Sequence, residues 1–246
     1  MAWIAQRPNP YGQSDAVLTG SPERTVVQAF LTRVYMFMAM GLGITGVVAL
    51  AVAGSPAAMS FIFGGRAILM GLIIAQLALV FAFSSVAARA SVGAAAAMLL
   101  AYSVLNGVTM ASIFLVYTRA SIGSTFLVTA GGFGAMAAYG SVTKRDLSSL
   151  GSFAMMGLFG IVIASVVNLF LGSPMIYWLT TFAGVIVFTG LTIYDASKLK
   201  VLAGVAAGRG NAAETKLALQ GALTLYLDFI NLFLILLRLF GGGRRR

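Results

Sequence analysis

The chain contains no cysteine and no histidine among its 246 residues. Without cysteine, the protein has no disulfides, thiolate nucleophiles or cysteine-bound metals. Without histidine, it lacks the side chain that most often titrates near neutral pH, so a pH response there must come from a perturbed carboxylate or lysine. Charged residues are also scarce, at 9% against roughly 25% in a typical soluble domain. The chain is therefore poorly suited to be a soluble globular protein.

Long apolar runs are abundant instead. The sequence is 60% hydrophobic, and its mean hydropathy is +0.97. A helical membrane crossing needs about 20 apolar residues, and seven runs approach or exceed that length: about Leu31–Gly54, Ala67–Ala87, Val92–Tyr117, Ile122–Tyr139, Gly151–Leu171, Met175–Tyr194 and Leu217–Phe240. We therefore predict an all-α polytopic membrane protein, a bundle of seven transmembrane helices.

The polar segments divide the chain into three parts. Residues 1–28 are polar and carry Pro8, Pro10 and Pro22, which indicates a disordered cytoplasmic tail rather than a signal peptide. Residues 29–240 form the membrane domain. Residues 241–246 form a basic C-terminal tail.

The excess of positive charge orients the bundle. If the N-terminus is cytoplasmic, ten Lys and Arg residues lie on that side and two, Arg66 and Arg119, lie opposite; the ten are Arg7, Arg24, Arg33, Arg89, Lys144, Arg145, Lys198, Lys200, Arg209 and Lys216. Topology thus explains the net charge of +10 better than nucleic-acid binding does. A complete seventh crossing places Arg244–Arg246 opposite the N-terminus, whereas a re-entrant helix would return them. We predict the complete crossing.

Asp228 is the most informative single residue. It lies near the middle of the last apolar run, LALQGALTLYLDFINLFLILLRLF, and an ionisable group at that depth indicates a functional site. On a helix, it shares one face with Gln220, Thr224 and Asn231. Because lipid offers no hydrogen-bond partners, this face must point toward other helices or a water-filled path.

Asp195 is the only other acidic residue in or beside a predicted crossing, since the remaining acids are Asp15, Glu23, Asp146 and Glu214. It follows Tyr194 at the end of the sixth run, three residues before Lys198, so a solvated ion pair is one interpretation. The other is a pair with Asp228. Two carboxylates in a low-dielectric setting cannot both ionise cheaply, so they would share one proton and sense pH without histidine.

Further polar residues lie inside the apolar runs. They either line an aqueous path or tie helices together: Gln76, Ser103, Asn106, Thr109, Ser165 and Asn168. The string GLGITG from Gly41 to Gly46 matches a dinucleotide-binding fingerprint, but it lies within an apolar run and lacks the strand that this motif requires. We interpret its glycines as sites of close helix packing.

Four stretches resemble the Bax inhibitor-1/YccA family, also called the transmembrane Bax inhibitor motif family: LTRVYMFMAMGLGITG, KRDLSSLGSF, FTGLTIYDASKL and LYLDFINLFLILLRLF. The resemblance implies a central C-terminal helix wrapped by the other six. It also implies a pH-dependent calcium leak in a bacterial inner membrane, gated by Asp195 and Asp228, which would bind calcium weakly and transiently. Gln220, Thr224, Asn231 and Asn106 would line its pore, and Arg89 would stand where relatives carry a basic latch.

Two function classes follow. One is the calcium leak, with no cofactor and with the bilayer and the calcium ion as partners. The alternative is an interaction protein in membrane stress that modulates a membrane AAA protease without conducting, as the resemblance also implies for bacterial relatives. An enzyme is not expected, because a serine–histidine dyad is impossible without histidine and the flanks of the two aspartates resemble the leak family rather than an aspartyl protease.

Overall fold

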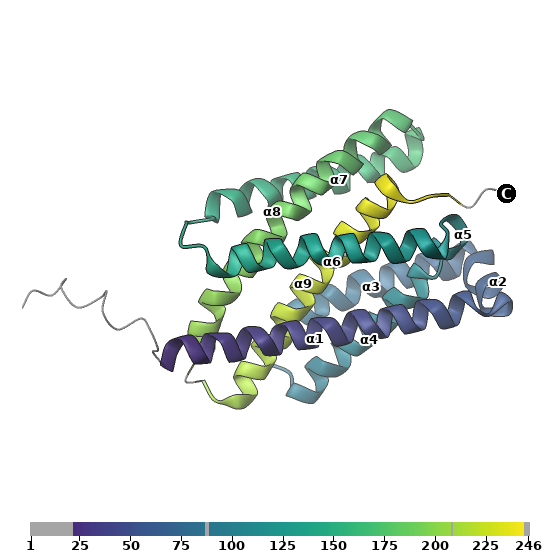
Figure 1. The fold of residues 1–246 in the computed structure, drawn as a ribbon. Coiled ribbons are helices and arrows are strands. Elements are labelled where there is room, and N and C mark those ends of the chain that lie inside the picture. The colour runs from purple at the N-terminus through teal and green to yellow at the C-terminus, as the bar shows by residue number, and fades with distance from the viewer. Residues whose placement is uncertain (1–21, 87–88, 208, 244–246) are drawn as a thin grey trace, which may run out of the picture.

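The structure is a computed structural model that describes residues 22–86, 89–207 and 209–243. These residues form nine helices (Figure 1): α1 (Pro22–Ala53), α2 (Pro56–Gly64), α3 (Arg66–Val86), α4 (Val92–Met110), α5 (Ile113–Val116), α6 (Arg119–Val142), α7 (Ser148–Leu171), α8 (Pro174–Ala206) and α9 (Asn211–Phe240). Seven spans are long and apolar enough to cross a membrane, with α4 and α5 forming one of them. The predicted seven-helix membrane bundle is confirmed.

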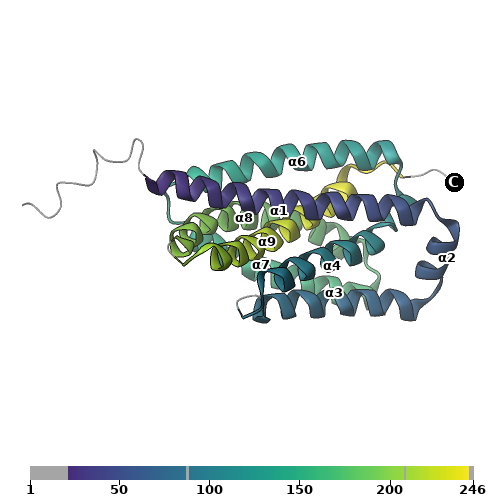
Figure 2. The same ribbon diagram turned by 90° about the horizontal axis from the view of Figure 1, so that it is seen from below.

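The last helix is the centre of the bundle, as predicted. In its most apolar stretch, 56% of the residues are buried, compared with 6% in α3 and in α7. It packs mainly on α1, α4, α6 and α8, whereas α3 packs on α4 and α7 packs on α8. Of the six helices expected to wrap α9, four pack directly on it. α3 and α7 form an outer layer at the periphery (Figures 1 and 2).

Several helices are longer than their apolar runs. The first begins at Pro22, earlier than the predicted boundary at residue 29, because proline fits the first turn of a helix where its missing N–H is not needed. Residues 1–21 of the predicted tail lie outside the described residues. The connection after α1 contains α2, whose first turn is capped by the Ser55 hydroxyl, which accepts a hydrogen bond from the N–H of Ala58 at 3.3 Å.

Glycine allows the closest helix approach at one position of α6. A Cβ on Gly140 would overlap the main-chain carbonyl oxygen of Ile193 in α8. Of the predicted packing glycines, Gly41 does lie against α4 and α9, with a Cβ there meeting Ser103 Oγ at 3.0 Å. Gly43 and Gly46 face open space instead, so the packing interpretation is wrong for them.

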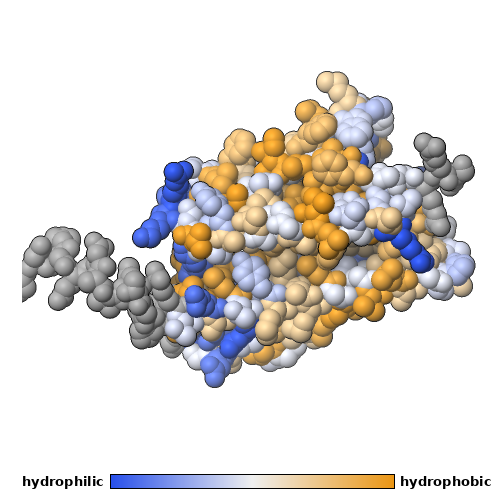
Figure 3. All heavy atoms as spheres, in the orientation of Figure 1, coloured by the Kyte–Doolittle hydropathy of each residue, from blue (hydrophilic) through white to orange (hydrophobic). Residues whose placement is uncertain are grey.

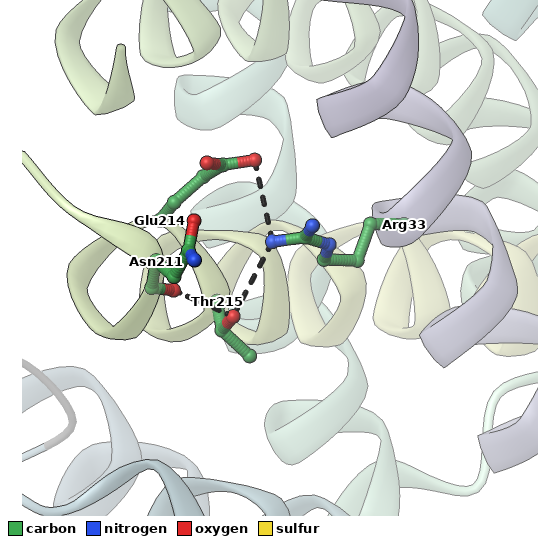
Figure 4. Close-up of polar contacts among 4 residues, drawn as sticks. All are labelled: Arg33, Asn211, Glu214 and Thr215. Atoms are coloured by element: carbon green, nitrogen blue, oxygen red, sulfur yellow. Dashed lines mark hydrogen bonds and ion pairs between the residues drawn. The ribbon is translucent and has the colours of Figure 1, made fainter. Parts of the chain in front are cut away.

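The end of the bundle at which α1 begins is fastened by a polar contact between α1 and α9. Arg33 Nη1 lies 3.3 Å from Glu214 Oε1 and donates a hydrogen bond of 3.3 Å to Thr215 Oγ1 (Figure 4). The Thr215 hydroxyl in turn donates to the carbonyl of Asn211 at 2.7 Å. The first turn of α9 is thereby held against α1. We call this end of the bundle the N-terminal end.

At the opposite end of the bundle, the segment after α9 is hydrogen-bonded to the start of α6. The N–H of Gly242 donates to Ser121 Oγ at 2.8 Å, and the N–H of Thr118 donates to the carbonyl of Gly242 at 3.4 Å. α9 is continuous and ends at this side (Figure 1), so it crosses the bundle as predicted and is not re-entrant. Residues 244–246 of the predicted basic tail lie outside the described residues.

The surface fits a membrane environment. Figure 3 shows a hydrophobic band across the middle of the bundle and hydrophilic side chains gathered at its ends, most of them at the N-terminal end. Many large apolar side chains are exposed on the surface of the bundle, including Leu169 and Phe170 in the last turn of α7 at 82% and 87%. Such exposure is unfavourable in water and favourable in lipid.

Candidate functional site

Asp228 lies in the interior of the bundle, on the central helix. Its side chain is only 5% exposed, and no hydrogen-bond partner reaches its Oδ2 among the described residues. The group that interacts with it is the carboxyl of Asp195 on α8. Two carboxylates can only accept hydrogen bonds, so the two groups bind each other only when one of them carries a proton. The structure thus brings the two predicted aspartates together.

The position of Asp195 differs from the prediction. It does not lie at the end of its helix, because α8 continues to Ala206. The residues after it, Ala196 to Ala206, are mostly Ala, Leu, Lys and Val, and Ala, Leu and Lys favour a helix. Lys198, three residues on, lies with Nζ 5.8 Å from the centre of the Tyr194 ring. Asp195 is half-buried and faces α9, so the interpretation as a solvated ion pair at a helix end is wrong.

Close packing of α8 on α9 produces this pairing. A Cβ on Gly221 of α9 would lie 2.5 Å from Leu199 Cδ2, and a Cβ on Gly184 of α8 would lie 2.6 Å from Ile235 Cδ1. These two glycines flank the aspartates along the interface. The backbones can therefore approach closely enough for two short carboxyl side chains to meet.

A cavity of about 580 Å³ adjoins Asp228. Its walls come from α3, α4, α7, α8 and α9, and it reaches Ser112 and Ile113, at the end of the bundle opposite the N-terminal end. Polar groups line it along three helices: Gln76, Tyr102, Asn106, Thr109, Thr224 and Asn231. We call it the Asp228 cavity.

A second cavity of about 240 Å³ adjoins Asp195 and lies toward the N-terminal end. Lys198, Val205 and Gln220 line it, near the connection between α8 and α9. Thr224 lines both cavities. The aspartate pair and Thr224 therefore separate a cavity that reaches toward one end of the bundle from a cavity that reaches toward the other.

The predicted polar face of α9 does face these cavities. Gln220 lines the Asp195 cavity, Asn231 lines the Asp228 cavity, and both are half-buried. Asn231 Nδ2 donates to the carbonyl of Leu227 at 2.8 Å, and the Thr224 hydroxyl donates to the carbonyl of Gln220 at 3.2 Å. Each of these side chains keeps oxygen lone pairs available to the cavity.

Asn106 is 6% exposed and lines the Asp228 cavity. It interacts with the hydroxyls of Tyr102 and Tyr226, two residues that were not among the predicted site residues. Tyr226 also lies 2.6 Å from Thr45 Oγ1 on α1. No sequence signal marked these tyrosines, because a tyrosine within an apolar run is equally consistent with simple packing.

Of the other polar residues that were predicted inside the apolar runs, some line the Asp228 cavity and others do not. Gln76 donates to Thr109 Oγ1 at 3.3 Å, and both line the Asp228 cavity. Ser165 is exposed on the outer face of α7, and Asn168 Oδ1 accepts from the N–H of Ser173 at 2.8 Å in the turn before α8. The aqueous-path interpretation is therefore wrong for Ser165 and Asn168, because α7 is peripheral.

Arg89 does not form a latch in this structure. It is exposed in the turn between α3 and α4, and within the described residues it forms no ion pair or hydrogen bond with Asp195 or Asp228.

The described residues contain no group of three or more His, Cys, Asp or Glu side chains that could hold a metal ion. One carboxyl pair with nearby amides and hydroxyls falls short of the six to eight oxygens of a tight calcium site.

Fold and site together define an integral membrane protein, a seven-helix bundle with a carboxyl pair in its interior. The sequence model of the family described as "Inhibitor of apoptosis-promoting Bax1" matches residues 27–245. The chain belongs to this Bax inhibitor-1 family.

Bacterial relatives cover nearly the whole chain. The inner membrane protein YbhL of Escherichia coli strain K12 is 49% identical over 234 residues, which is 95% of this chain and 99% of that protein. An uncharacterized protein of Borreliella burgdorferi is 40% identical, covering 90% of this chain and 95% of its own. An uncharacterized membrane protein of Streptococcus pyogenes serotype M1 is 37% identical, covering 86% and 92%.

Proposed function

We propose that this protein is a pH-sensitive leak channel for calcium and related cations, gated by Asp195 and Asp228. The observation that carries the proposal is the position of the pair between two cavities, with Thr224 common to both. An ion that passed from one cavity to the other would have to pass these carboxyl groups. Weak binding there favours conduction, since a permeant ion must be able to leave.

Protonation sets the state of the gate. With one proton between them, the carboxyls hydrogen-bond and hold α8 to α9. With both ionised, they repel each other and attract a cation into the gap. Lys198 acts electrostatically on Asp195 from the N-terminal side. Flux through the site should therefore rise with pH.

Reconstitution in liposomes tests the proposal. The purified full-length chain is incorporated into vesicles that contain a calcium-sensitive dye, and calcium influx is recorded as a function of pH. Asp228→Asn and Asp195→Asn should each flatten the pH dependence, because the remaining carboxyl titrates alone. The double variant should add little, since either change already breaks the pair.

Asp146→Asn is the matched control. Asp146 is exposed in the connection between α6 and α7, so its neutralisation should leave the profile of the wild type unchanged. If both pathway variants also keep the wild-type profile, the gate is elsewhere and the proposal fails.

We place the protein in the inner membrane, as the name of its E. coli relative states for that protein, with the N-terminus in the cytoplasm. The charge bias supports this orientation, because Lys144, Arg145, Lys198, Lys200 and Lys216 all lie near the N-terminal end. The proposal includes neither a catalytic role nor a cofactor, and no nucleic acid among the partners.

Binding to a membrane AAA protease is the competing function. Deleting residues 1–21 separates the two, because a leak should survive the deletion and a function that uses this segment as a handle should not.

A further inference from the structure

A separate apolar groove lies between α1 and α6, in the half of the bundle away from the N-terminal end. It has a volume of about 300 Å³, and Phe229 and Phe233 of α9 form its floor. Leu50 and Phe126 line it from α1 and α6 and are 55% and 41% exposed, so the groove opens to the outside of the bundle. Figures 1 and 2 both show α1 and α6 side by side over α9. In a membrane, this opening faces lipid.

Arg119 lies at the end of the groove. Together with Phe114, it also lines a second cavity of about 660 Å³, which α2 and the segment before α6 enclose. The apolar groove and this second cavity adjoin each other, and the guanidinium of Arg119 lies where they meet. In a bilayer, the apolar acyl chains likewise meet the charged headgroups at one boundary.

Among the described residues, no acidic side chain lies near Arg119 at this end of the bundle. Of the acidic side chains that the structure describes, Asp146 and Glu214 lie near the N-terminal end, and Asp195 and Asp228 lie in the interior. Arg119 forms no ion pair among the described residues. Within the described residues, no carboxylate neutralises Arg119, and its exposed side chain is accessible to a ligand from outside the bundle. The planar guanidinium suits a phosphate, which it can bind through two parallel hydrogen bonds.

We propose that this groove binds one anionic phospholipid, with an acyl chain against Phe229 and Phe233 and the phosphate at Arg119. The groove has a volume at the lower end of the range of small-ligand sites, about 300 to 1,000 Å³. The site is distinct from the aspartate cavities and does not depend on the proposed leak.

Substitution of either of two glycines, one on each wall, should fill the groove with a side chain. Gly46 of α1 and Gly123 of α6 both line it, and a Cβ at either position meets no heavy atom within 4 Å. Gly46→Leu and Gly123→Leu should therefore fold and occupy the space of the acyl chain. Gly132→Leu is the matched control, since Gly132 lies on α6, is equally unobstructed and does not line the groove.

The charge is tested separately. Arg119→Gln removes the phosphate contact. Arg66→Gln is its control, because Arg66 begins α3 at the same end of the bundle and does not line the groove.

The measurement is native mass spectrometry of the full-length protein in detergent, titrated with phosphatidylglycerol and, in parallel, with phosphatidylcholine. The wild type should bind phosphatidylglycerol more tightly. Arg119→Gln should weaken that binding about fivefold and remove the preference over phosphatidylcholine. Both groove-filling variants should lose the binding of either lipid, and both controls should match the wild type.

Circular dichroism confirms that each variant is folded. If one of the two groove-filling variants does not fold, the other one alone tests the proposal. The proposal is overturned if a folded filling variant binds phosphatidylglycerol as the wild type does. It is also overturned if Arg119→Gln keeps the wild-type preference between the two lipids, or if added inorganic phosphate alone displaces the lipid completely.

Discussion

Replacing Asp228 with leucine should make the protein more stable while it abolishes the proposed gate. The side chain is 5% exposed, and its Oδ2 has no hydrogen-bond partner among the described residues. A buried polar atom without a partner costs about 1 to 3 kcal/mol. Leucine has a similar shape, removes this cost and, where both carboxyls are ionised, ends their repulsion. We therefore expect the free energy of unfolding to rise by about 1 to 3 kcal/mol.

The gain should be measurable as a thermal midpoint. For a chain of this size, 1 kcal/mol corresponds to roughly 2 to 4 °C, so the midpoint should rise by roughly 2 to 12 °C. Unfolding is followed by circular dichroism of the purified protein in one detergent. The gain should be larger at alkaline than at acidic pH, because the wild-type pair loses its shared proton there and the variant has only one carboxyl.

Asn231→Leu is the control for this experiment. Asn231 is one turn further along the same face of α9, but its amide already donates to the carbonyl of Leu227 at 2.8 Å. Its replacement should cost about 1 kcal/mol or have no effect. The reasoning is refuted if Asp228→Leu is less stable than the wild type at both pH values, because the carboxyl would then be a net stabilising group in the interior.

Three further predictions use other parts of the structure. Gly140→Ala should lower the free energy of unfolding by about 1 to 3 kcal/mol, because the new Cβ meets backbone, while Gly132→Ala in the same helix should not lower it. The hydroxyl and the N–H of Ser148 hold the pKa of Asp146 below its ordinary value, so Ser148→Ala should raise that pKa in a carbon-13 NMR titration. Because the folded-state pKa is lowered, this contribution to stability is present at neutral pH and is lost as the pH falls through that pKa. A cysteine at Ser149 should react with impermeant maleimide only from the cytoplasmic side, and labelling from outside in intact cells would reverse the proposed orientation.

Composition and apolar runs were sufficient to predict the class of fold. A run of about 20 apolar residues has few alternatives to a membrane helix, because every backbone polar group must be satisfied within it. The polar face of α9 was predictable for the same reason, since helical periodicity places Gln220, Thr224, Asp228 and Asn231 together. The scarcity of acidic residues offered a pair of Asp195 with Asp228 as one of two interpretations, and the family resemblance favoured it.

The ends of the apolar runs did not predict the ends of the helices. The sixth apolar run ended at Tyr194, yet α8 continues past Lys198 and Lys200 to Ala206, because lysine favours a helix as well as water. Asp195 was therefore placed at a helix end when it lies within the helix. The role of α7 was missed in a similar way, since its sequence is as apolar as that of the other crossings and only packing shows that it is peripheral.

The sequence by itself determined that seven helices cross a membrane and that two carboxyls lie among them, because burying charge in lipid leaves few other solutions. Tertiary structure decided which groups meet. The cavities on either side of the aspartate pair arise from side chains on α3, α4, α7, α8 and α9, and the groove at Arg119 arises mainly from α1, α6 and α9. These spaces depend on how ridges and glycines of different helices fit together, and that fit is a property of packed pairs rather than of any single segment.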